Sequence, residues 1–371
     1  MQEEEFLARK LAERAQKQAL RQLAFSRAKV DFCSNDYLGL AGNELFRRFL
    51  ADEQSEHLWE AGSTGSRLLS GNHPLFEKTE KRIARFHNVE AALLFNSGYD
   101  ANLGLLSSIA GRGDAILYDS LIHASLRDGI RLSLAPSYSF AHNDLDSLEK
   151  KLIQVNRRSF VVVESIYSMD GDQAPLKEVS DLCRRYGAGL IVDEAHATGV
   201  MGSKGEGLVQ ALGLGNDCFA RVHTFGKALG VHGAAVVGSE LLKQYLVNFA
   251  RTFIYTTAMP PAAVSAIDAA YRFFPKMKAE RTRLKKYIRL FQAVELPFEK
   301  LLSDTPIQIV LIPGNEAVHA AAAELQRCGL NVKPILHPTV AQGKERLRIV
   351  LHSFNTPQEL DCLIGKLQGL G

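Results

Sequence analysis

Lys227 lies in the stretch HTFGKALG, where Gly226 and Gly230 flank it. Upstream, the apolar run GLIVD ends at Asp193, and His196 follows it closely. A lysine amine condenses with an aldehyde to form a Schiff base, and a carboxylate buried at a strand end requires a cationic partner such as a protonated pyridine nitrogen. This acid and this lysine therefore give the layout that pyridoxal phosphate (PLP) chemistry needs, with His196 as a hydrogen-bond donor to the phenolic oxygen of the cofactor.

The tetrapeptide DEAH also admits other interpretations. Asp193 alone would suit a helix cap or a metal ligand, and His196 alone would suit a cap or a core histidine. The same letters form the DEAH box of helicases, but that box requires a GxxxxGK[ST] phosphate loop upstream, which this sequence lacks. We therefore exclude a helicase and expect no metal ion.

The turn NSGY follows an apolar strand and opens a helix. Backbone N–H groups at a helix N-terminus bind phosphate, so Ser97, Gly98 and Tyr99 are candidates for a phosphate cup. Such turns are common, so the turn indicates a phosphate cup only in combination with Lys227. Thr224, three residues before the lysine, can add a hydroxyl group to the same phosphate.

Further polar side chains follow strands or lie on one. The imidazole of His123, in LIHASL, can stack on the cofactor ring, although a core or surface histidine is the alternative. Ser168 follows a strand and precedes the turn MDGD, which lacks the ligand series of a calcium loop. Arg346 and Arg348 alternate on RLRIVL and share one face, where a guanidinium group can pair with a substrate carboxylate.

Short apolar strands alternate with amphipathic helices through the middle of the chain. The predicted strands cover 91–98, 115–120, 137–143, 159–165, 189–196, 218–225 and 234–239, and the predicted helices cover 75–88, 99–111, 123–133, 144–154 and 177–187. This alternation indicates a mainly parallel, doubly wound sheet with helices on both faces. Because catalytic groups in such sheets lie beyond the carboxyl ends of the strands, we expect the candidate residues to meet at one edge.

The two ends of the chain do not follow the alternating pattern of the middle. Residues 3–24 predict an amphipathic helix, and 30–42 predict a short strand followed by a turn-rich loop. A long helical stretch from about 260 to 293 precedes three further strands, within 306–314, 332–338 and 346–353. We therefore expect an N-terminal helix and arm (1–45), a large PLP-binding domain (46–259) and a smaller α+β domain (260–371).

The composition is that of a globular protein, with 371 residues, of which 46% are hydrophobic and 23% are charged. A net charge of +3, with both signs interspersed, argues against a nucleic-acid partner. The five cysteines form no CxxC pair, so we expect reduced thiols in a cytoplasmic protein. The charged N-terminus is not typical of a secretion signal, and no apolar run approaches the ~20 residues that cross a bilayer.

Taken together, several motifs resemble those of fold-type I PLP enzymes and, within them, of the α-oxoamine synthase family. The motifs that carry the resemblance are SNDYLGL (34–40), GSTGSRLLSG (62–71), HASL (123–126), FAHND (140–144), SMDGD (168–172), DEAHATGVMG (193–202), TFGKALGVHGAAV (224–236), IYTTAMPP (254–261) and ERLRIVL (345–351). The resemblance covers almost the whole chain. It implies a large domain with a mainly parallel seven-stranded sheet and a smaller C-terminal α+β domain.

The resemblance also implies a role for each matching residue. The implied catalytic residues are Lys227, Asp193, His196 and His123. The implied cofactor contacts also include Ser97, Gly98, Tyr99, Ser168, Thr224 and, from a second subunit, Thr257. The implied substrate contacts are Arg348, Asn35 and Arg21, with Arg346 as the second choice for the carboxylate. A catalytically silent partner subunit is disfavoured, since such subunits typically lose the lysine.

Enzymes of this family are acyltransferases that join an amino acid to an acyl thioester with loss of CO2. The stretches GKALGVHGAAV, FIYTTAMPP and FAHND are most similar to the family's branch in biotin synthesis, which implies L-alanine and pimeloyl-CoA or pimeloyl-acyl-carrier protein as substrates. Relatives that use glycine, or serine with a long acyl chain, stay open as alternatives. The resemblance implies a homodimer with shared active sites. The segment before VDFCSNDYLGL is shorter than usual in the family, which leaves the acyl chain length open.

Overall fold

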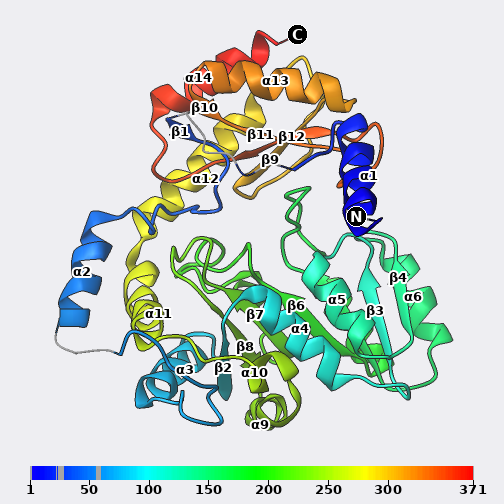
Figure 1. Ribbon diagram of the computed structural model, residues 1–371, viewed down its shortest axis with the longest axis vertical. Coiled ribbons are helices and arrows are strands. Elements are labelled where there is room, and N and C mark those ends of the chain that lie inside the picture. The colour runs from blue at the N-terminus through cyan, green and yellow to red at the C-terminus, as the bar shows by residue number, and fades with distance from the viewer. Residues whose placement is uncertain (1, 22, 24–28, 56–59, 371) are drawn as a thin grey trace. The chain divides into compact units, whose positions relative to one another are not determined.

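The computed structural model of the chain describes residues 2–21, 23, 29–55 and 60–370 (Figure 1). The chain forms two compact units. The larger unit comprises Asp36–Ser168 and Gln173–Arg281, and the smaller unit comprises Met1–Asn35, Met169–Asp172 and Thr282–Gly371. Each unit has its own sheet and is described by itself.

A seven-stranded sheet forms the core of the larger unit. In spatial order its strands are β2 (Ala91–Phe95), β8 (Ala234–Gly238), β7 (Cys218–Thr224), β6 (Gly189–Asp193), β5 (Ser159–Glu164), β3 (Ala115–Asp119) and β4 (Ser137–Phe140). Of these strands, β8 runs antiparallel to both of its neighbours and the others are parallel to one another. Strands β2 and β5 are buried along their whole length, as expected for a sheet covered on both faces. The predicted mainly parallel, seven-stranded sheet is confirmed.

Helices connect the strands and cover the sheet, and Figure 1 shows α4 and α5 crossing one of its faces. The helices of the larger unit are α2 (Glu44–Ser55), α3 (Pro74–Phe86), α4 (Gly98–Ile109), α5 (Ala124–Leu132), α6 (Leu145–Gln154), α7 (Leu176–Tyr186), α8 (Leu208–Ala211), α9 (Glu240–Phe249), α10 (Arg251–Ile254), α11 (Pro261–Phe273) and the short η1 (Phe274–Lys276). Side-chain caps fix where several of them begin. Ser97, Asp144 and Ser239 each accept a hydrogen bond from a backbone N–H of the first turn.

The smaller unit combines helices with two small sheets. Its helices are α1 (Gln2–Gln16), most of α12 (Lys278–Ala293), α13 (Asn315–Arg327) and α14 (Pro357–Gln368). Its strands are β1 (Val30–Asp31), which pairs with β10 (Leu330–Asn331), and β11 (Lys333–Ile335), β12 (Arg346–Val350) and β9 (Ile307–Leu311), which form an antiparallel sheet in that order. The predicted N-terminal helix over 3–24 ends at Gln16, and residues 22 and 24 lie outside the described part of the chain.

The long helical stretch predicted from 260 to 293 is interrupted. Helix α11 ends at Phe273, a single turn of 3-10 helix follows, and α12 begins at Lys278. Pro275 lies in the interruption, where it lacks the N–H that a continuous helix would use. Helix α11 packs against α2 and α3 and so belongs to the larger unit. The three-part division predicted from the sequence, with limits at 45/46 and 259/260, stays a prediction.

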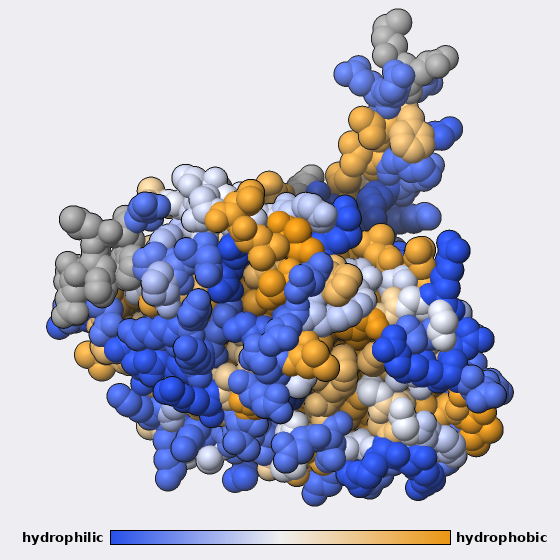
Figure 2. Space-filling model, turned by 90° about the horizontal axis from the view of Figure 1, so that it is seen from below, coloured by the Kyte–Doolittle hydropathy of each residue, from blue (hydrophilic) through white to orange (hydrophobic). Residues whose placement is uncertain are grey.

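Figure 2 shows one face of the molecule, on which charged and polar side chains surround smaller groups of apolar ones. Single exposed apolar side chains are normal on protein surfaces. No described helix combines the length and the hydropathy that crossing a lipid bilayer requires.

A pair of stacked histidines is buried in the larger unit. The rings of His87 and His223 lie 3.7 Å apart with an angle of 21° between their planes. His87 Nε2 lies 2.9 Å from the hydroxyl of Tyr271, and His223 Nδ1 lies 2.8 Å from that of Thr198. Burial lowers the pKa of both histidines well below the usual value, and the nearby Arg221 guanidinium lowers both further. Both rings are therefore neutral in the folded protein at neutral pH.

This pair predicts a loss of stability in acid. A histidine whose pKa is lowered by folding binds its proton only in the unfolded chain, so its contribution is complete above the unfolded pKa of about 6.5 and is lost as the pH falls below it. Each histidine adds a slope of up to about 1.4 kcal/mol per pH unit. We expect His223→Gln to flatten the acid limb of the unfolding free energy between pH 8 and 5, measured by urea unfolding.

The matched control for this experiment is His319→Gln, which changes an exposed histidine of α13. The control is expected to keep the acid slope of the parent protein. Glu194 is a buried acid whose pKa rises to about 7 through burial, so its own contribution has the opposite sign, being complete below about 4.5 and lost as the pH rises through about 7. Glu194 is present in all three proteins and does not affect the comparison. Equal acid slopes in parent and His223→Gln would contradict the prediction.

Candidate active site

The candidate residues of the larger unit lie just beyond the carboxyl ends of parallel strands. Ser97, Gly98 and Tyr99 follow β2, His123 follows β3, Ser168 follows β5, Asp193 ends β6 and Thr224 ends β7. In a parallel sheet these ends lie along one edge, where the helix N-termini and loops also gather. The prediction that strand ends bring these segments to one edge of the sheet is therefore confirmed.

The loop that carries Lys227 connects β7 to β8 and is closed by its own backbone. Phe225 N donates to Gly233 O at 2.9 Å, and Gly230 N donates to Lys227 O at 2.9 Å. Gly230 has a φ of +62°, and a Cβ at this position would lie 2.3 Å from the backbone nitrogen of Ala41. Only glycine fits there. The loop conformation, and with it the half-buried Lys227, is therefore fixed on both sides.

Asp193 is 5% exposed, and its two oxygens have separate donors. Asn102 Nδ2 donates to Oδ2 at 2.8 Å, and Ala195 N donates to Oδ1 at 2.8 Å. Two hydrogen bonds fix the plane of the carboxylate and compensate part of the cost of burying it. This carboxylate can therefore offer a fixed negative charge to a cationic ring nitrogen.

His123 begins α5, and its exposed side chain lies within electrostatic range of both Asp193 and Lys227. Its Nδ1 accepts a hydrogen bond from Ser125 N at 3.2 Å and lies 2.8 Å from Ser125 Oγ. Partial desolvation of the ring lowers the pKa of His123, the Asp193 charge opposes this effect and the Lys227 charge adds to it. The imidazole is therefore neutral at physiological pH.

Glu164 and Tyr37 hold two of the site histidines. Glu164 lies opposite Asp193 on the neighbouring strand and accepts a hydrogen bond from His123 N. Burial raises the pKa of Glu164 well above its usual value, and the Asp193 charge raises it further. Tyr37 OH lies 2.5 Å from Nδ1 of the buried His196 and orients that ring.

The N-terminus of α4 and the end of β7 form a narrow cradle. A Cβ on Gly98 would lie 2.3 Å from Thr224 Oγ1, so the backbone approaches this hydroxyl as only glycine allows. Ser97 caps the helix by accepting from Asp100 N at 3.0 Å. The exposed Tyr99 donates its hydroxyl proton to Asp128, and its backbone N–H lies in the first turn of α4. The first N–H groups of a helix have no intrahelical acceptor and attract phosphate.

This set of groups fits PLP. A fixed buried carboxylate suits the pyridine nitrogen, a half-buried lysine suits the aldehyde, and the cradle between α4 and Thr224 suits the phosphate. Among the described residues, no group of three or more His, Cys, Asp or Glu is arranged to hold a metal ion.

The predicted substrate residues belong to the smaller unit, where Arg348 and Asn35 meet. Arg348 donates to Asn35 Oδ1 at 3.0 Å, which fixes the half-buried guanidinium group. Arg346 is 5% exposed and pairs instead with Asp170 at 2.6 Å and with Met169 O at 2.9 Å. Arg346 therefore has a structural partner, which favours Arg348 for binding a substrate carboxylate.

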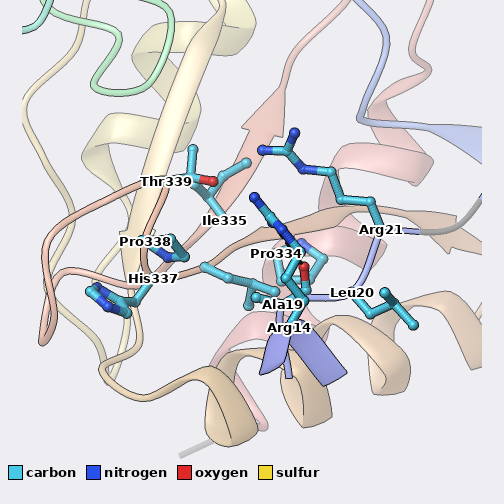
Figure 3. Close-up of a pocket in the computed structure, with 10 residues that line it drawn as sticks. Arg14, Ala19, Leu20, Arg21, Pro334, Ile335, His337, Pro338 and Thr339 are labelled. Carbon is cyan, nitrogen blue, oxygen red and sulfur yellow. Dashed lines mark hydrogen bonds between the residues drawn. The ribbon is translucent and has the colours of Figure 1, made fainter. Parts of the chain in front are cut away.

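Arg21 lines a pocket of about 450 Å³ in the smaller unit. Figure 3 shows the guanidinium groups of Arg14 and Arg21 extending into it from the N-terminal segment, with Ile335 and Thr339 across from them. Leu20, Pro334, Leu336 and Pro338 form further apolar wall. Two cations beside an apolar wall suit a ligand that has both an alkyl chain and an anionic group.

Thr257 lies in an exposed segment, and its carbonyl oxygen accepts from Asn96 Nδ2 at 3.0 Å. Asn96 Nδ2 also donates to Thr256 Oγ1 at 3.0 Å, so the segment is held beside the start of α4. The predicted contact of Thr257 with a neighbouring subunit, and the cofactor and substrate roles of the other residues, stay predictions.

The sequence reasoning did not identify Asn102, Ser125, Glu164 or Tyr37. Asn102 lies one helical turn after Gly98 and is a polar residue on the otherwise apolar buried face of α4, which is the signal that could have pointed to it. Glu164 ends the apolar run SFVVVE, where a terminal acid is equally unexpected. Tyr37 and Ser125 carry no comparable signal, because their partners become visible only in the fold.

Comparison with known proteins identifies the family to which the chain belongs. Residues 27–367 match the family model of aminotransferase class I and II. An 8-amino-7-oxononanoate synthase from Emericella nidulans is 42% identical over 91% of this chain and 88% of its own. A solved 8-amino-7-oxononanoate synthase from Francisella tularensis is 28% identical, with a TM-score of 0.78 over 92% of this chain and 97% of its own.

A serine palmitoyltransferase from S. paucimobilis, solved with bound PLP, is 26% identical, with a TM-score of 0.88 over 98% of this chain and 96% of its own. The likeness confirms the predicted PLP-dependent fold type I. The chain therefore belongs to the aminotransferase class I and II family and groups within it with the 8-amino-7-oxononanoate synthases.

Proposed function

We propose that the chain is a PLP-dependent acyltransferase that condenses L-alanine with a pimeloyl thioester. The products are 8-amino-7-oxononanoate, CO2 and the free thiol of CoA or of an acyl-carrier protein, which is a step of biotin biosynthesis. We propose further that it acts in the cytoplasm as a homodimer, in which Thr257 of one subunit contributes to the site of the other.

One observation carries this proposal. A carboxylate fixed by two donors and a lysine on a closed loop lie at one sheet edge, in a chain 42% identical to a protein named 8-amino-7-oxononanoate synthase. When bound, PLP withdraws electrons from the α-carbon of an attached amino acid. That chemistry needs an acid beside the ring nitrogen and an amine for the aldehyde, and Asp193 and Lys227 supply them.

The residues of the chain then have separate tasks. Asp193 holds a proton on the pyridine nitrogen, and Lys227 holds the cofactor at rest and takes the α-proton of L-alanine. Arg348, oriented by Asn35, binds the carboxylate of the amino acid. His196 donates a hydrogen bond to the phenolic oxygen of the cofactor, and Tyr37 fixes the ring of His196. His123 hydrogen-bonds the carbonyl oxygen of the substrate.

We assign the pocket of Arg14 and Arg21 to the acyl chain. A pimeloyl group has an apolar methylene chain that ends in a carboxylate, which matches an apolar wall beside two guanidinium groups. Two guanidinium groups that line one pocket can both pair with an anion. The distal carboxylate of the donor is the anion that we assign to them.

The function is tested by incubating the purified holoenzyme with L-alanine, glycine or serine and with pimeloyl-CoA, pimeloyl-acyl-carrier protein or a long-chain acyl-CoA. We expect 8-amino-7-oxononanoate and free thiol from L-alanine with a pimeloyl donor. Preferential turnover of serine with the long-chain thioester, or of glycine with any donor, would replace this proposal with another activity of the family.

Arg21→Ala is expected to raise the KM for the pimeloyl donor by about 10- to 100-fold, because a charge-assisted hydrogen bond is lost. The KM for L-alanine should stay unchanged. A thioester of the same chain length without the distal carboxylate should be used equally by both proteins. Arg327→Ala, at an exposed position of α13 in the same unit, is the control. An unchanged KM for the pimeloyl donor in Arg21→Ala would remove Arg21 from the acyl site.

A further inference from the structure

We infer that Asn102 and Ser125 are positioning residues, which link Asp193 to His123 and fix the ring proton of His123 on Nε2. The four residues come from α4, α5 and the end of β6, and all lie in the larger unit. Neither Asn102 nor Ser125 is exposed by more than 2% of its surface. The assigned tautomer rests on the hydrogen bonds alone, and only its consequence for catalysis rests on the proposed function.

Asn102 begins the chain of hydrogen bonds. Its Nδ2 donates to Asp193 Oδ2 at 2.8 Å and to Ser125 Oγ at 2.9 Å, so both amide hydrogens are used. Turning the amide over would place its oxygen against the Asp193 carboxylate, which has no proton to donate. The ionised carboxylate therefore sets the orientation of the Asn102 amide.

Ser125 connects the Asn102 amide to the ring of His123. Its oxygen accepts from Asn102, and its hydroxyl lies 2.8 Å from His123 Nδ1, to which it can donate. The backbone N–H of Ser125 donates to the same Nδ1 at 3.2 Å. The backbone N–H can only donate, so a proton on Nδ1 would face it and leave it without this acceptor. The arrangement therefore requires an unprotonated Nδ1, and the neutral imidazole has its proton on Nε2.

The consequence is a fixed hydrogen-bond donor in the site. With Nδ1 engaged toward the protein, Nε2–H lies on the other side of the exposed ring of His123. Such a donor can stabilise negative charge that develops on a carbonyl oxygen of the substrate. Asn102 thus acts on both the Asp193 carboxylate and His123, whereas Ser125 acts on His123 alone.

The test is nitrogen NMR of the holoenzyme labelled with 15N-histidine, with the His123 signals assigned by their absence in His123→Asn. We expect an unprotonated Nδ1 and a protonated Nε2 in the parent protein. Ser125→Ala should raise the fraction of the tautomer with a proton on Nδ1, because only the backbone N–H of residue 125 then favours an unprotonated Nδ1. Ser108→Ala, on α4 with a hydroxyl bonded only within its own helix, should leave the tautomer unchanged. A proton on Nδ1 of the parent protein, or an unchanged ring in Ser125→Ala, would overturn the inference.

The affinity for PLP distinguishes the role of Asn102 from that of Ser125. Asn102→Ala should weaken binding of PLP to the apoprotein by about 10- to 100-fold, because a charge-assisted hydrogen bond to Asp193 is lost. Ser125→Ala should leave this affinity within about threefold, because it removes no bond to Asp193. An equal loss of PLP affinity in both variants would contradict the assignment that only Asn102 acts on Asp193. If Asn102→Ala does not fold, the tautomer of the parent protein and of Ser125→Ala still decides the inference.

Neither measurement uses a substrate. A failure to form 8-amino-7-oxononanoate would therefore leave both results standing, whereas a wrong tautomer would leave the proposed reaction standing. The two ideas can be refuted independently.

Discussion

Lys227→Ala is expected to lower kcat by at least about 10³-fold, because one change removes both the covalent anchor of PLP and the base that takes the α-proton. The loop should survive the change. Its closing bonds from Phe225 N to Gly233 O and from Gly230 N to Lys227 O are backbone bonds, which alanine retains. The loss can therefore be attributed to the missing amine rather than to a displaced loop.

Two measurements check this expectation. Turnover of L-alanine with pimeloyl-CoA gives kcat, and mass spectrometry of peptides after borohydride reduction shows whether PLP is fixed at position 227. Lys204→Ala, which changes an exposed lysine of the same unit, is expected to keep both kcat and the labelled Lys227. Full turnover by Lys227→Ala, or a label on another lysine of the parent protein, would contradict the assignment.

The edge of the sheet could be predicted from the sequence because its signals are local. Most strands of the larger unit appear as short apolar runs. Asp193 and Thr224 each end a strand, and Lys227 comes three residues after Thr224. Parallel topology then brings the strand ends together without any knowledge of side-chain packing. Asp193, Thr224 and Lys227 could be found in this way.

The hydrogen-bond partners of these residues could not be predicted, because they come from distant parts of the chain. Asn102 and Asp193 are 91 residues apart, and Tyr37 and His196 are 159 residues apart. A buried asparagine in an apolar helix has many possible partners until the order of the strands is known. The same limit applies to the choice between Arg346 and Arg348, which only the ion pair of Arg346 with Asp170 favours on structural grounds.

The ends of two long predicted helices differ from the structure. The apolar spacing continues through residues 260–293, but Pro275 interrupts the helix after Phe273. The N-terminal helix ends at Gln16, although apolar residues at helical spacing continue beyond it. Periodicity alone does not mark where a helix stops, since a proline or a change of packing decides the end.

Asp193→Asn is the second change with a large expected effect. The two side chains have the same shape, but the negative charge that holds the proton on the pyridine nitrogen is gone. We expect kcat to fall by about 10²- to 10³-fold, the range for losing one pre-organised electrostatic group in an active site. The affinity for PLP should fall as well, because a cationic ring nitrogen would lack its partner.

The hydrogen bonds of Asp193 make the substitution more severe than a simple loss of charge. The carboxylate accepts from Asn102 Nδ2 and from Ala195 N at two different oxygens. An asparagine has one oxygen, so its amide nitrogen must face one of these donors. Either Asn102 or the backbone at Ala195 is then left without its acceptor, and the plane of the side chain is no longer fixed.

Comparison with Asp193→Glu separates charge from geometry, because glutamate retains the charge but extends it by one methylene group. If the charge dominates, glutamate should retain more activity than asparagine, and the visible spectrum of its bound PLP should titrate with pH as in the parent protein. Asp181→Asn, at an exposed position of α7, is the control for changing one acid of this unit. Normal turnover by Asp193→Asn would show that the ring nitrogen needs no carboxylate, and the electron-withdrawing role of the cofactor would then need another source.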